Sequence, residues 1–250
     1  MGDLNPAEPP HFLKRDGLPR LAFRFRPGRG PAILFLPGYA SDMTGSKAEA
    51  IDAWAAESGR AMLRFDYAGC GESEGRFDQG TLASWRDDAL AMVDASQGDL
   101  VLVGSSMGGW LMLLVAIARP DRVRALLGIA SAPDFSDWGY DQDEKMRILQ
   151  DGRIEQPSAY GPPMVTTRAF WQSAESQRLL HAPIPFDGPV RLLHGEADPE
   201  VPTWVSQRVA ALVRSADVQT ILVKDGDHRL SRPQDIALLL RTLDTLLESL

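Results

Sequence analysis

The sequence predicts one α/β domain in which a mostly parallel central sheet is flanked by helices. Three observations predict this fold class: short apolar runs, segments of helical spacing between them, and a length of 250 residues of which 44% are hydrophobic. A chain of this size can bury a substantial core, and one α/β domain is usual at this length. We therefore expect residues 1–250 to form a single domain.

The apolar runs have the character of β-strands. Residues 21–25 alternate like an exposed strand, whereas the later runs are short and mostly continuously apolar, as in strands that are buried on both faces. These later runs cover residues 32–37, 61–67, 100–104, 190–194 and 218–224. Helical spacing occurs between them, in about residues 46–58, 81–96, 107–118, 203–215 and 233–247. Alternation of strand and helix is typical of a doubly wound α/β fold.

The interval from about residue 133 to residue 185 interrupts this alternation. It is rich in proline, glycine and charge, and it carries scattered aromatic residues: Phe135, Trp138, Tyr140, Tyr160, Phe170 and Trp171. A long connection inside a compact domain is usually functional. We expect residues 133–185 to form a lid or cap insertion.

Composition limits the partners and the location. The formal net charge of −8 disfavours nucleic acid and anionic membranes as bulk electrostatic partners. Cys70 is the only cysteine, so an intramolecular disulfide is excluded and a reducing compartment fits. The N-terminal residues lack the apolar core of a signal peptide, and the longest apolar run is too short to span a membrane. We expect a cytoplasmic protein without integral membrane contact.

The stretch Gly104-Ser105-Ser106-Met107-Gly108 matches G-x-S-x-G with Ser106 at its centre. It lies after a predicted strand and before a predicted helix, which is the context of a nucleophile elbow. Ser105 does not fit, because Val103 and Met107 would occupy the glycine positions. Two interpretations stand at this point: a catalytic serine at residue 106, or an ordinary glycine–serine turn.

A serine nucleophile requires a base and an acid that orients the base. His228 is the candidate base, because it lies in a polar loop between the last predicted strand and the final helix. His194 ends a predicted strand and is interpreted as structural, while His11 and His181 lie in less suitable segments. Asp198 is the candidate acid, which gives the chain order serine, aspartate, histidine that is associated with α/β-hydrolases.

Other carboxylates and donors complete the candidate site. Glu196 is the second choice for the acid, and Asp225 and Asp227 are disfavoured because they share the loop of the histidine. For the oxyanion hole we predict the backbone N–H of Met107, next to the serine, and that of Tyr39, in the loop after the strand at residues 32–37.

Several other patterns are interpreted as structural. The glycine spacing in the stretch GCGESEG, which begins at Gly69, misses the dinucleotide fingerprint. Cys70 within it has no histidine nearby in sequence and is interpreted as packing. The histidines do not show metal-ligand spacing, so we expect neither a metal nor another cofactor.

Five long blocks of the chain together resemble a known family. They are LPGYASDMTGSKA, RFDYAGCGESEG, LVGSSMGGWLMLLVAIARP, APIPFDGPVRLLHGEAD and DGDHRL. They resemble the alpha/beta hydrolase superfamily, in particular its subgroup of mitochondrial palmitoyl-protein thioesterases, also described as mycophenolic acid acyl-glucuronide esterases. The resemblance implies an α/β-hydrolase fold and a serine hydrolase, with the nucleophile at Ser106, the acid at Asp198 and the base at His228.

The expected function is therefore cleavage of activated acyl groups, in acyl-protein thioesters or acyl-glucuronide esters, through an acyl-enzyme. A small-molecule acyl ester or thioester, or an acylated protein, is the expected partner. The candidate wall of an acyl groove consists of Trp138, Met146, Met164 and Phe170, with packing of the insertion on the core as the competing interpretation. Arg147, Arg153 and Arg168 are candidates for binding a glucuronide carboxylate on charge alone.

Three alternatives remain open from the sequence. The first is a general carboxylesterase of small esters, and the second is a cofactor-free perhydrolase with the same triad. The third belongs to another class: a small-molecule receptor that uses a hydrolase fold without catalysis.

Overall fold

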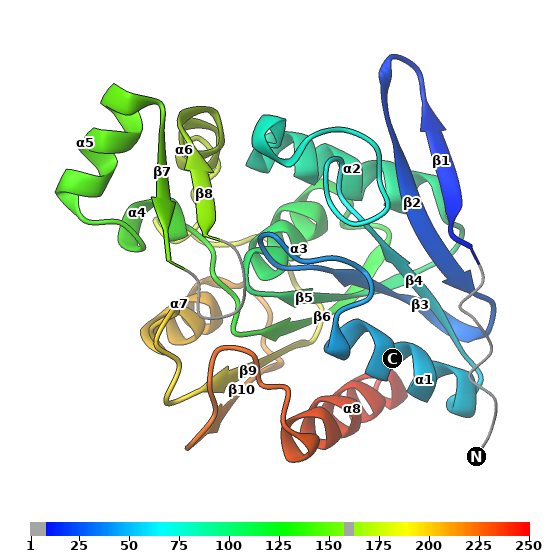
Figure 1. Ribbon diagram of the computed structural model, residues 1–250. Helices are drawn as coiled ribbons and strands as arrows, with labels where there is room; N and C mark the ends of the chain where they lie inside the picture. Colours follow the sequence, from blue (N-terminus) through cyan, green and yellow to red (C-terminus); the bar gives the residue numbers. More distant parts are fainter. Residues whose placement is uncertain (1–8, 158–162) are drawn as a thin grey trace.

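The structure is a computed structural model that describes residues 9–157 and 163–250. In this part of the chain, eight strands form one sheet in the order β1-β2-β4-β3-β5-β6-β9-β10 (Figure 1). Their bounds are β1 His11–Arg15, β2 Leu18–Arg26, β3 Arg29–Leu36, β4 Arg60–Phe65, β5 Leu100–Ser105, β6 Val123–Ile129, β9 Val190–Gly195 and β10 Val218–Val223. All neighbouring pairs from β4 to β10 are parallel, whereas β2 pairs antiparallel with both β1 and β4. The predicted mostly parallel sheet is confirmed.

Helices cover both faces of the sheet, as Figure 1 shows for α1 and α8 on one side and α2 and α3 on the other. The helices that flank the sheet are α1 Ser46–Ser58, α2 Leu82–Ala95, α3 Met107–Ala118, α7 Trp204–Leu212 and, after the last strand, α8 Pro233–Glu248. Each of the five corresponds to a predicted helix. Their boundaries differ from the prediction by a few residues at most, as expected for helix ends.

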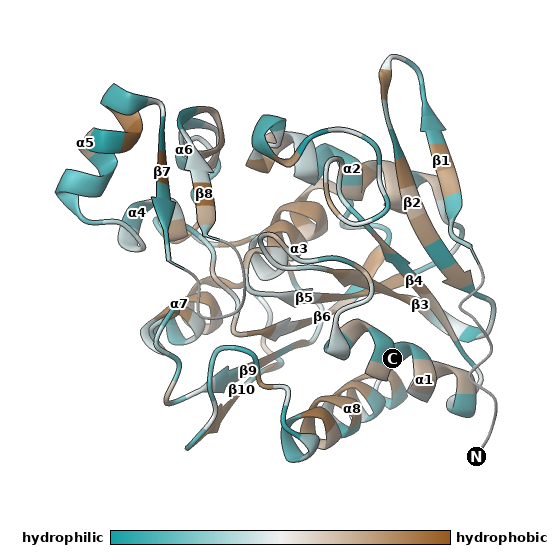
Figure 2. Ribbon diagram, in the orientation of Figure 1, coloured by the Kyte–Doolittle hydropathy of each residue, from teal (hydrophilic) through white to brown (hydrophobic). Residues whose placement is uncertain are grey.

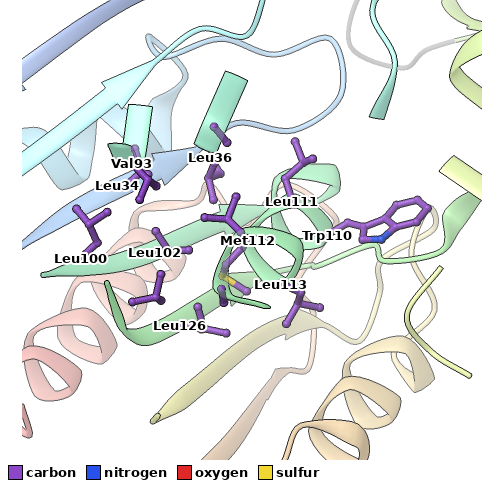
Figure 3. Packing of buried hydrophobic residues seen from close by; sticks show 14 of the residues in the cluster. Leu34, Leu36, Val93, Leu100, Leu102, Trp110, Leu111, Met112, Leu113 and Leu126 are labelled. Atoms are coloured by element: carbon purple, nitrogen blue, oxygen red, sulfur yellow. The ribbon is translucent and has the colours of Figure 1, made fainter. Parts of the chain in front are cut away.

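The period of two in the strands divides the core between the two faces. In β3, Ile33 and Phe35 face a cluster with residues of α1 and α8, while Leu34 and Leu36 face a cluster with residues of α2 and α3. Figure 3 shows leucines of β3 and β5 around Met112 of α3, whereas the ring of Trp110, in the same cluster, points away from them. In Figure 2 the central strands are largely hydrophobic. This two-sided burial explains why these strands are continuously apolar in sequence.

The segment between β6 and β9 leaves the sheet and forms its own small elements on one side of the molecule (Figure 1). These elements are α4 Phe135–Trp138, α5 Gln142–Asp151, β7 Arg153–Gln156, β8 Met164–Thr167 and α6 Arg168–Glu175, with β7 and β8 paired antiparallel. Tyr160 lies outside the described residues.

Asp134, near the start of this segment, is hydrogen-bonded to residues near its end. Its two carboxylate oxygens accept hydrogen bonds from the backbone N–H groups of Leu179 and Leu180, both at 2.8 Å. The segment is therefore anchored at its base.

Candidate active site

The polypeptide turns sharply at Ser106, between β5 and α3. Ser106 has φ 55° and ψ −120°, a conformation that L-residues rarely adopt and that costs about 1–3 kcal/mol. Glycines on both sides make the turn possible. A Cβ on Gly104 would lie 2.4 Å from the carbonyl oxygen of Gly108, and a Cβ on Gly108 would lie 2.0 Å from that of Leu36. The motif thus has a steric reason, because side chains at these positions would collide with backbone.

The structure brings Ser106, His228 and Asp198 into one hydrogen-bonded chain. His228 Nε2 lies 3.1 Å from Ser106 Oγ, and His228 Nδ1 lies 2.9 Å from Asp198 Oδ2. An ionised carboxylate only accepts, so Nδ1–H donates to it and Nε2 is left to accept the proton of the serine hydroxyl. The three residues follow β5, β10 and β9, at the carboxyl ends of parallel strands, where ligands bind in open α/β sheets.

Asp198 is held as a buried carboxylate, with its side chain 0% exposed. Its Oδ1 accepts backbone N–H groups of Glu200 at 2.8 Å and Val201 at 2.9 Å. Burial is the largest influence and raises the pKa of Asp198, but His194, His228 and the Val201 N–H together outweigh it. The pKa of Asp198 therefore lies well below its ordinary value, and the carboxylate is ionised beside His228.

The two residues that are predicted to supply oxyanion donors neighbour the serine: Met107 follows it in the chain, and Tyr39 lines both cavities with it. Met107 is the first residue of α3, so its N–H has no acceptor within the helix. The loop after β3 lies against the turn, since a Cβ on Gly38 would lie 3.4 Å from Ser106 Cβ. In this loop the Tyr39 hydroxyl donates to the carbonyl oxygen of Val165 at 2.5 Å, and burial raises the pKa of Tyr39. This bond ties the loop to β8.

Two cavities meet at Ser106. One, of about 450 Å³, is largely apolar and aromatic; its lining includes Phe135, Trp138, Tyr140, Met164 and Val201. The other, of about 510 Å³, has charged and hydroxyl side chains beside apolar ones such as Phe77 and Val165; its lining includes Ser41, Asp42, Lys47 and Arg229. Ser106, Tyr39, Met164 and Glu200 line both. The serine therefore stands between a cavity with an aromatic wall, called the apolar cavity below, and a cavity that carries charged side chains, called the polar cavity.

Only part of the predicted acyl groove lines these cavities. Trp138 and Met164 do, whereas Met146 and Phe170 do not. Met146 is 48% exposed, because α5 buries Ile148 and a separation of two residues turns a helix by about 200°. Phe170 is 1% exposed, and the centroid of its ring lies 4.9 Å from that of Tyr39, so Phe170 packs in the core.

The three arginines that were candidates for a glucuronide carboxylate also lie outside both cavities. Arg153 pairs with Glu155, and Arg168 donates to backbone carbonyl groups of α5. Charge alone was a poor guide, because it does not indicate the direction of a side chain.

Other residues at the site have no signal in the sequence. Glu200 lines both cavities, and its Oε2 lies 3.6 Å from His228 Nε2. Lys47 Nζ donates to the backbone carbonyl of Arg229 at 2.6 Å, and burial lowers the pKa of Lys47 to about 8. Lys47 lies in α1 and Glu200 lies in the loop between β9 and α7, and both are distant from Ser106 in sequence.

Cys70 is buried and is not activated as a nucleophile. Cys70 is 7% exposed, and burial raises its pKa to about 12, which disfavours the thiolate. Within residues 9–157 and 163–250, no group of three or more His, Cys, Asp or Glu side chains could hold a metal ion. No helix in these ranges is both long and apolar enough to cross a membrane.

Comparisons with known proteins agree with this architecture. Residues 33–237 match the model of the alpha/beta hydrolase family. The human mitochondrial palmitoyl-protein thioesterase ABHD10 is 44% identical over 245 residues, which cover 96% of this chain and 80% of the relative. The solved structure of mouse alpha/beta hydrolase domain-containing protein 10 is 43% identical, with a TM-score of 0.91 and coverage of 96% and 98% of the two chains.

A bacterial structure is also similar. A putative hydrolase from Agrobacterium vitis is 35% identical, with a TM-score of 0.89 and coverage of 95% of this chain and 98% of the other. The enzyme Est1E from Butyrivibrio proteoclasticus shares the fold, with a TM-score of 0.79 at 21% identity.

The expected cytoplasmic location is contradicted by these comparisons. Relatives that are 44% identical, from human, orangutan and cattle, are named as mitochondrial proteins. The expectation failed because an acidic composition and a single cysteine are compatible with several compartments and do not distinguish among them.

Proposed function

The chain belongs to the alpha/beta hydrolase family, and from this premise we propose that it hydrolyses acyl thioesters or esters through an acyl-enzyme on Ser106. The observation that carries the proposal is the hydrogen-bonded chain from Ser106 through His228 to the buried Asp198, at the junction of two cavities. The relatives named palmitoyl-protein thioesterases support thioesters as the substrate class.

In the first half of the reaction, Ser106 Oγ attacks the acyl carbonyl while His228 Nε2 accepts its proton. The Asp198 carboxylate keeps the other ring proton on Nδ1 and stabilises the imidazolium that forms. The Met107 and Tyr39 N–H groups stabilise the oxyanion, each by a factor of about 10²–10³ in rate. Collapse of the tetrahedral intermediate expels the thiol or alcohol, which takes the proton from His228, and leaves the acyl group on Ser106.

In the second half, water replaces the leaving group. His228 Nε2 accepts a proton from the water as its oxygen attacks the acyl-enzyme, and then returns the proton to Ser106 Oγ. The free acid leaves and the starting state is restored. The same three side chains therefore serve both steps.

The cavities divide the substrate at the scissile bond. The apolar cavity, with Trp138 and Tyr140, receives the acyl chain, because apolar area is favourably buried there. The polar cavity, with Lys47 and Arg229, receives the leaving group. Residues 133–185 act as a lid, since this segment supplies most of the aromatic wall and is connected to the oxyanion loop by the Tyr39 hydroxyl.

The test combines labelling with kinetics. The purified protein is treated with a fluorophosphonate probe, and hydrolysis is measured on acyl thioesters and matched oxyesters from acetyl to palmitoyl. We expect labelling of Ser106 by mass spectrometry, and a loss of about 10⁴-fold or more in kcat for Ser106→Ala. Ser105→Ala is the matched control: Ser105 lines one of the cavities beside Ser106, but His228 Nε2 is hydrogen-bonded to Ser106 Oγ, so labelling of Ser106 and hydrolysis should both persist.

The outcomes separate the alternatives. A preference for short oxyesters would favour a general carboxylesterase, and peroxide-dependent halogenation would favour a perhydrolase. Absence of both labelling and hydrolysis would indicate a receptor without catalysis. Unchanged turnover in Ser106→Ala would refute the mechanism.

A further inference from the structure

A second histidine lies directly behind the buried acid. His194, in β9, is 0% exposed, and its Nε2 lies 3.5 Å from Asp198 Oδ2. The same Nε2 lies 2.8 Å from the carbonyl oxygen of Val201, and Nδ1 lies 2.7 Å from Ser206 Oγ in α7. Asp198 Oδ2 is therefore placed between two imidazoles, that of His228 on the side of the serine and that of His194 on the side of the core.

The hydrogen-bond partners define the tautomer of His194. A carbonyl oxygen only accepts, so Nε2 carries a proton and donates it to Val201, while Asp198 Oδ2 lies 3.5 Å from the same nitrogen. In the neutral ring Nδ1 then accepts the hydroxyl proton of Ser206. Ser206 is 1% exposed, so water does not compete for this position. The ring is thus fixed with its positive N–H edge toward the acid.

The acid needs such a contact because it is removed from water. A carboxylate that is 0% exposed must be stabilised by protein donors, or it takes up a proton. The backbone N–H groups of Glu200 and Val201 serve Oδ1, while His228 Nδ1–H and the His194 Nε2–H edge face Oδ2. His194 also lowers the pKa of Asp198 against the effect of burial.

His194 acts on the acid through the backbone as well. It holds the carbonyl group of Val201, the residue whose N–H donates to Asp198 Oδ1 at 2.9 Å. Both oxygens of the carboxylate are therefore oriented by contacts that include His194.

We propose that His194 is a positioning residue, which holds the Asp198 carboxylate ionised and directed at His228 Nδ1. This inference rests on the proposed function of Ser106, His228 and Asp198. His194 does not contact the substrate; it affects the reaction because it orients the acid.

The test compares two substitutions at one position. His194→Leu retains much of the volume and removes the N–H, whereas His194→Gln retains a donor. For His194→Leu we expect kcat for an acyl thioester to fall about 10- to 100-fold, the range seen for groups that orient metal ligands, with KM within about twofold. His194→Gln should recover most of the loss. Leu192→Ala, in the same buried strand, is the control for packing and should lower stability while leaving kcat near wild type.

A spectroscopic measurement makes the test independent of the substrate. The downfield proton resonance of His228 Nδ1–H, assigned by its absence in His228→Ala, reports the bond to Asp198. It should shift or broaden in His194→Leu and persist in His194→Gln and Leu192→Ala. If His194→Leu does not fold, Ser206→Ala takes its place, since it removes the hydroxyl that fixes the tautomer and should cause a smaller change of the same kind.

Two results would overturn the inference: a wild-type resonance with wild-type kcat in His194→Leu, or equal losses in His194→Leu and His194→Gln. Absence of ester and thioester hydrolysis in the wild-type protein would instead refute the proposed function. In that case the resonance still tests whether His194 orients Asp198.

Discussion

Replacement of Asp198 by asparagine is the sharpest perturbation of the candidate site, because it keeps the shape of the side chain and replaces an acceptor by a donor at the oxygen that faces His228. Two backbone N–H groups bind Oδ1 at 2.8 and 2.9 Å, so the amide oxygen of the variant occupies this position. The amide NH₂ then replaces Oδ2, which lies 2.9 Å from His228 Nδ1. Two donors would face each other there, and the imidazole must move its proton to Nε2.

A proton on Nε2 blocks the reaction, because this nitrogen lies 3.1 Å from Ser106 Oγ and can no longer accept from it. We expect kcat to fall about 10⁴-fold, which corresponds to about 5.4 kcal/mol in the barrier. KM should change little, since Asp198 does not line either cavity. The assay is steady-state hydrolysis of an acyl thioester, with circular dichroism to verify folding.

Two other carboxylates provide matched controls. Glu196 was the second choice for the acid and is exposed, and Asp227 neighbours His228 in sequence but accepts the N–H of Leu230. Glu196→Gln and Asp227→Asn should therefore retain kcat within about threefold, as expected for groups outside the relay. The reasoning is refuted if Asp198→Asn keeps a tenth of wild-type kcat, or if either control falls as steeply.

Three further predictions concern the surroundings of the serine. Gly108→Ala places a Cβ 2.0 Å from a backbone oxygen of β3 and should lower the free energy of unfolding by about 3 kcal/mol or more. Gly98→Ala, whose Cβ would have nothing within 4 Å, should lower it by about 1 kcal/mol. Urea unfolding measures both losses, and equal losses would contradict the steric argument. Tyr39→Phe removes the bond to Val165 at 2.5 Å, worth about 1 kcal/mol, so hydrogen exchange in β8 should accelerate about fivefold; unchanged exchange would contradict a role in anchoring β8. Burial lowers the pKa of Lys47 to about 8 in the folded state. Between pH 8 and the ordinary pKa of 10.5 the unfolded state therefore binds more protons, so the free energy of unfolding should rise over this window, by about 2 kcal/mol relative to Lys47→Met. A difference between the two proteins in urea unfolding that does not change with pH would refute the shift.

Much of the fold was predictable because its signals are local. The strands that are buried on both faces form continuous apolar runs, and the helices that flank the sheet show helical spacing of apolar residues, except α3, which is apolar on nearly every face. The prediction lacked β6, a central strand, because Arg124 and Gly128 interrupt its apolar run. It also lacked β7 and β8, which have four residues each and pair only with one another.

The sequence by itself determined which three loops could meet. The glycines around Ser106 encode a turn that is open to few other residues, and His228 and Asp198 follow predicted strands whose carboxyl ends share one edge of the sheet. These are relations between neighbours in the chain, so they can be seen without coordinates. The same information did not indicate what surrounds the loops.

Only the tertiary structure decided which side chains line the cavities and what supports the acid. It turned Met146 toward solvent, buried Phe170 in the core and placed the ring of His194 against Asp198. Directions of this kind depend on how the segment at residues 133–185 and helix α7 pack on distant strands. Local propensity does not encode such contacts, because each arises from two or more segments that become neighbours only when the chain has folded.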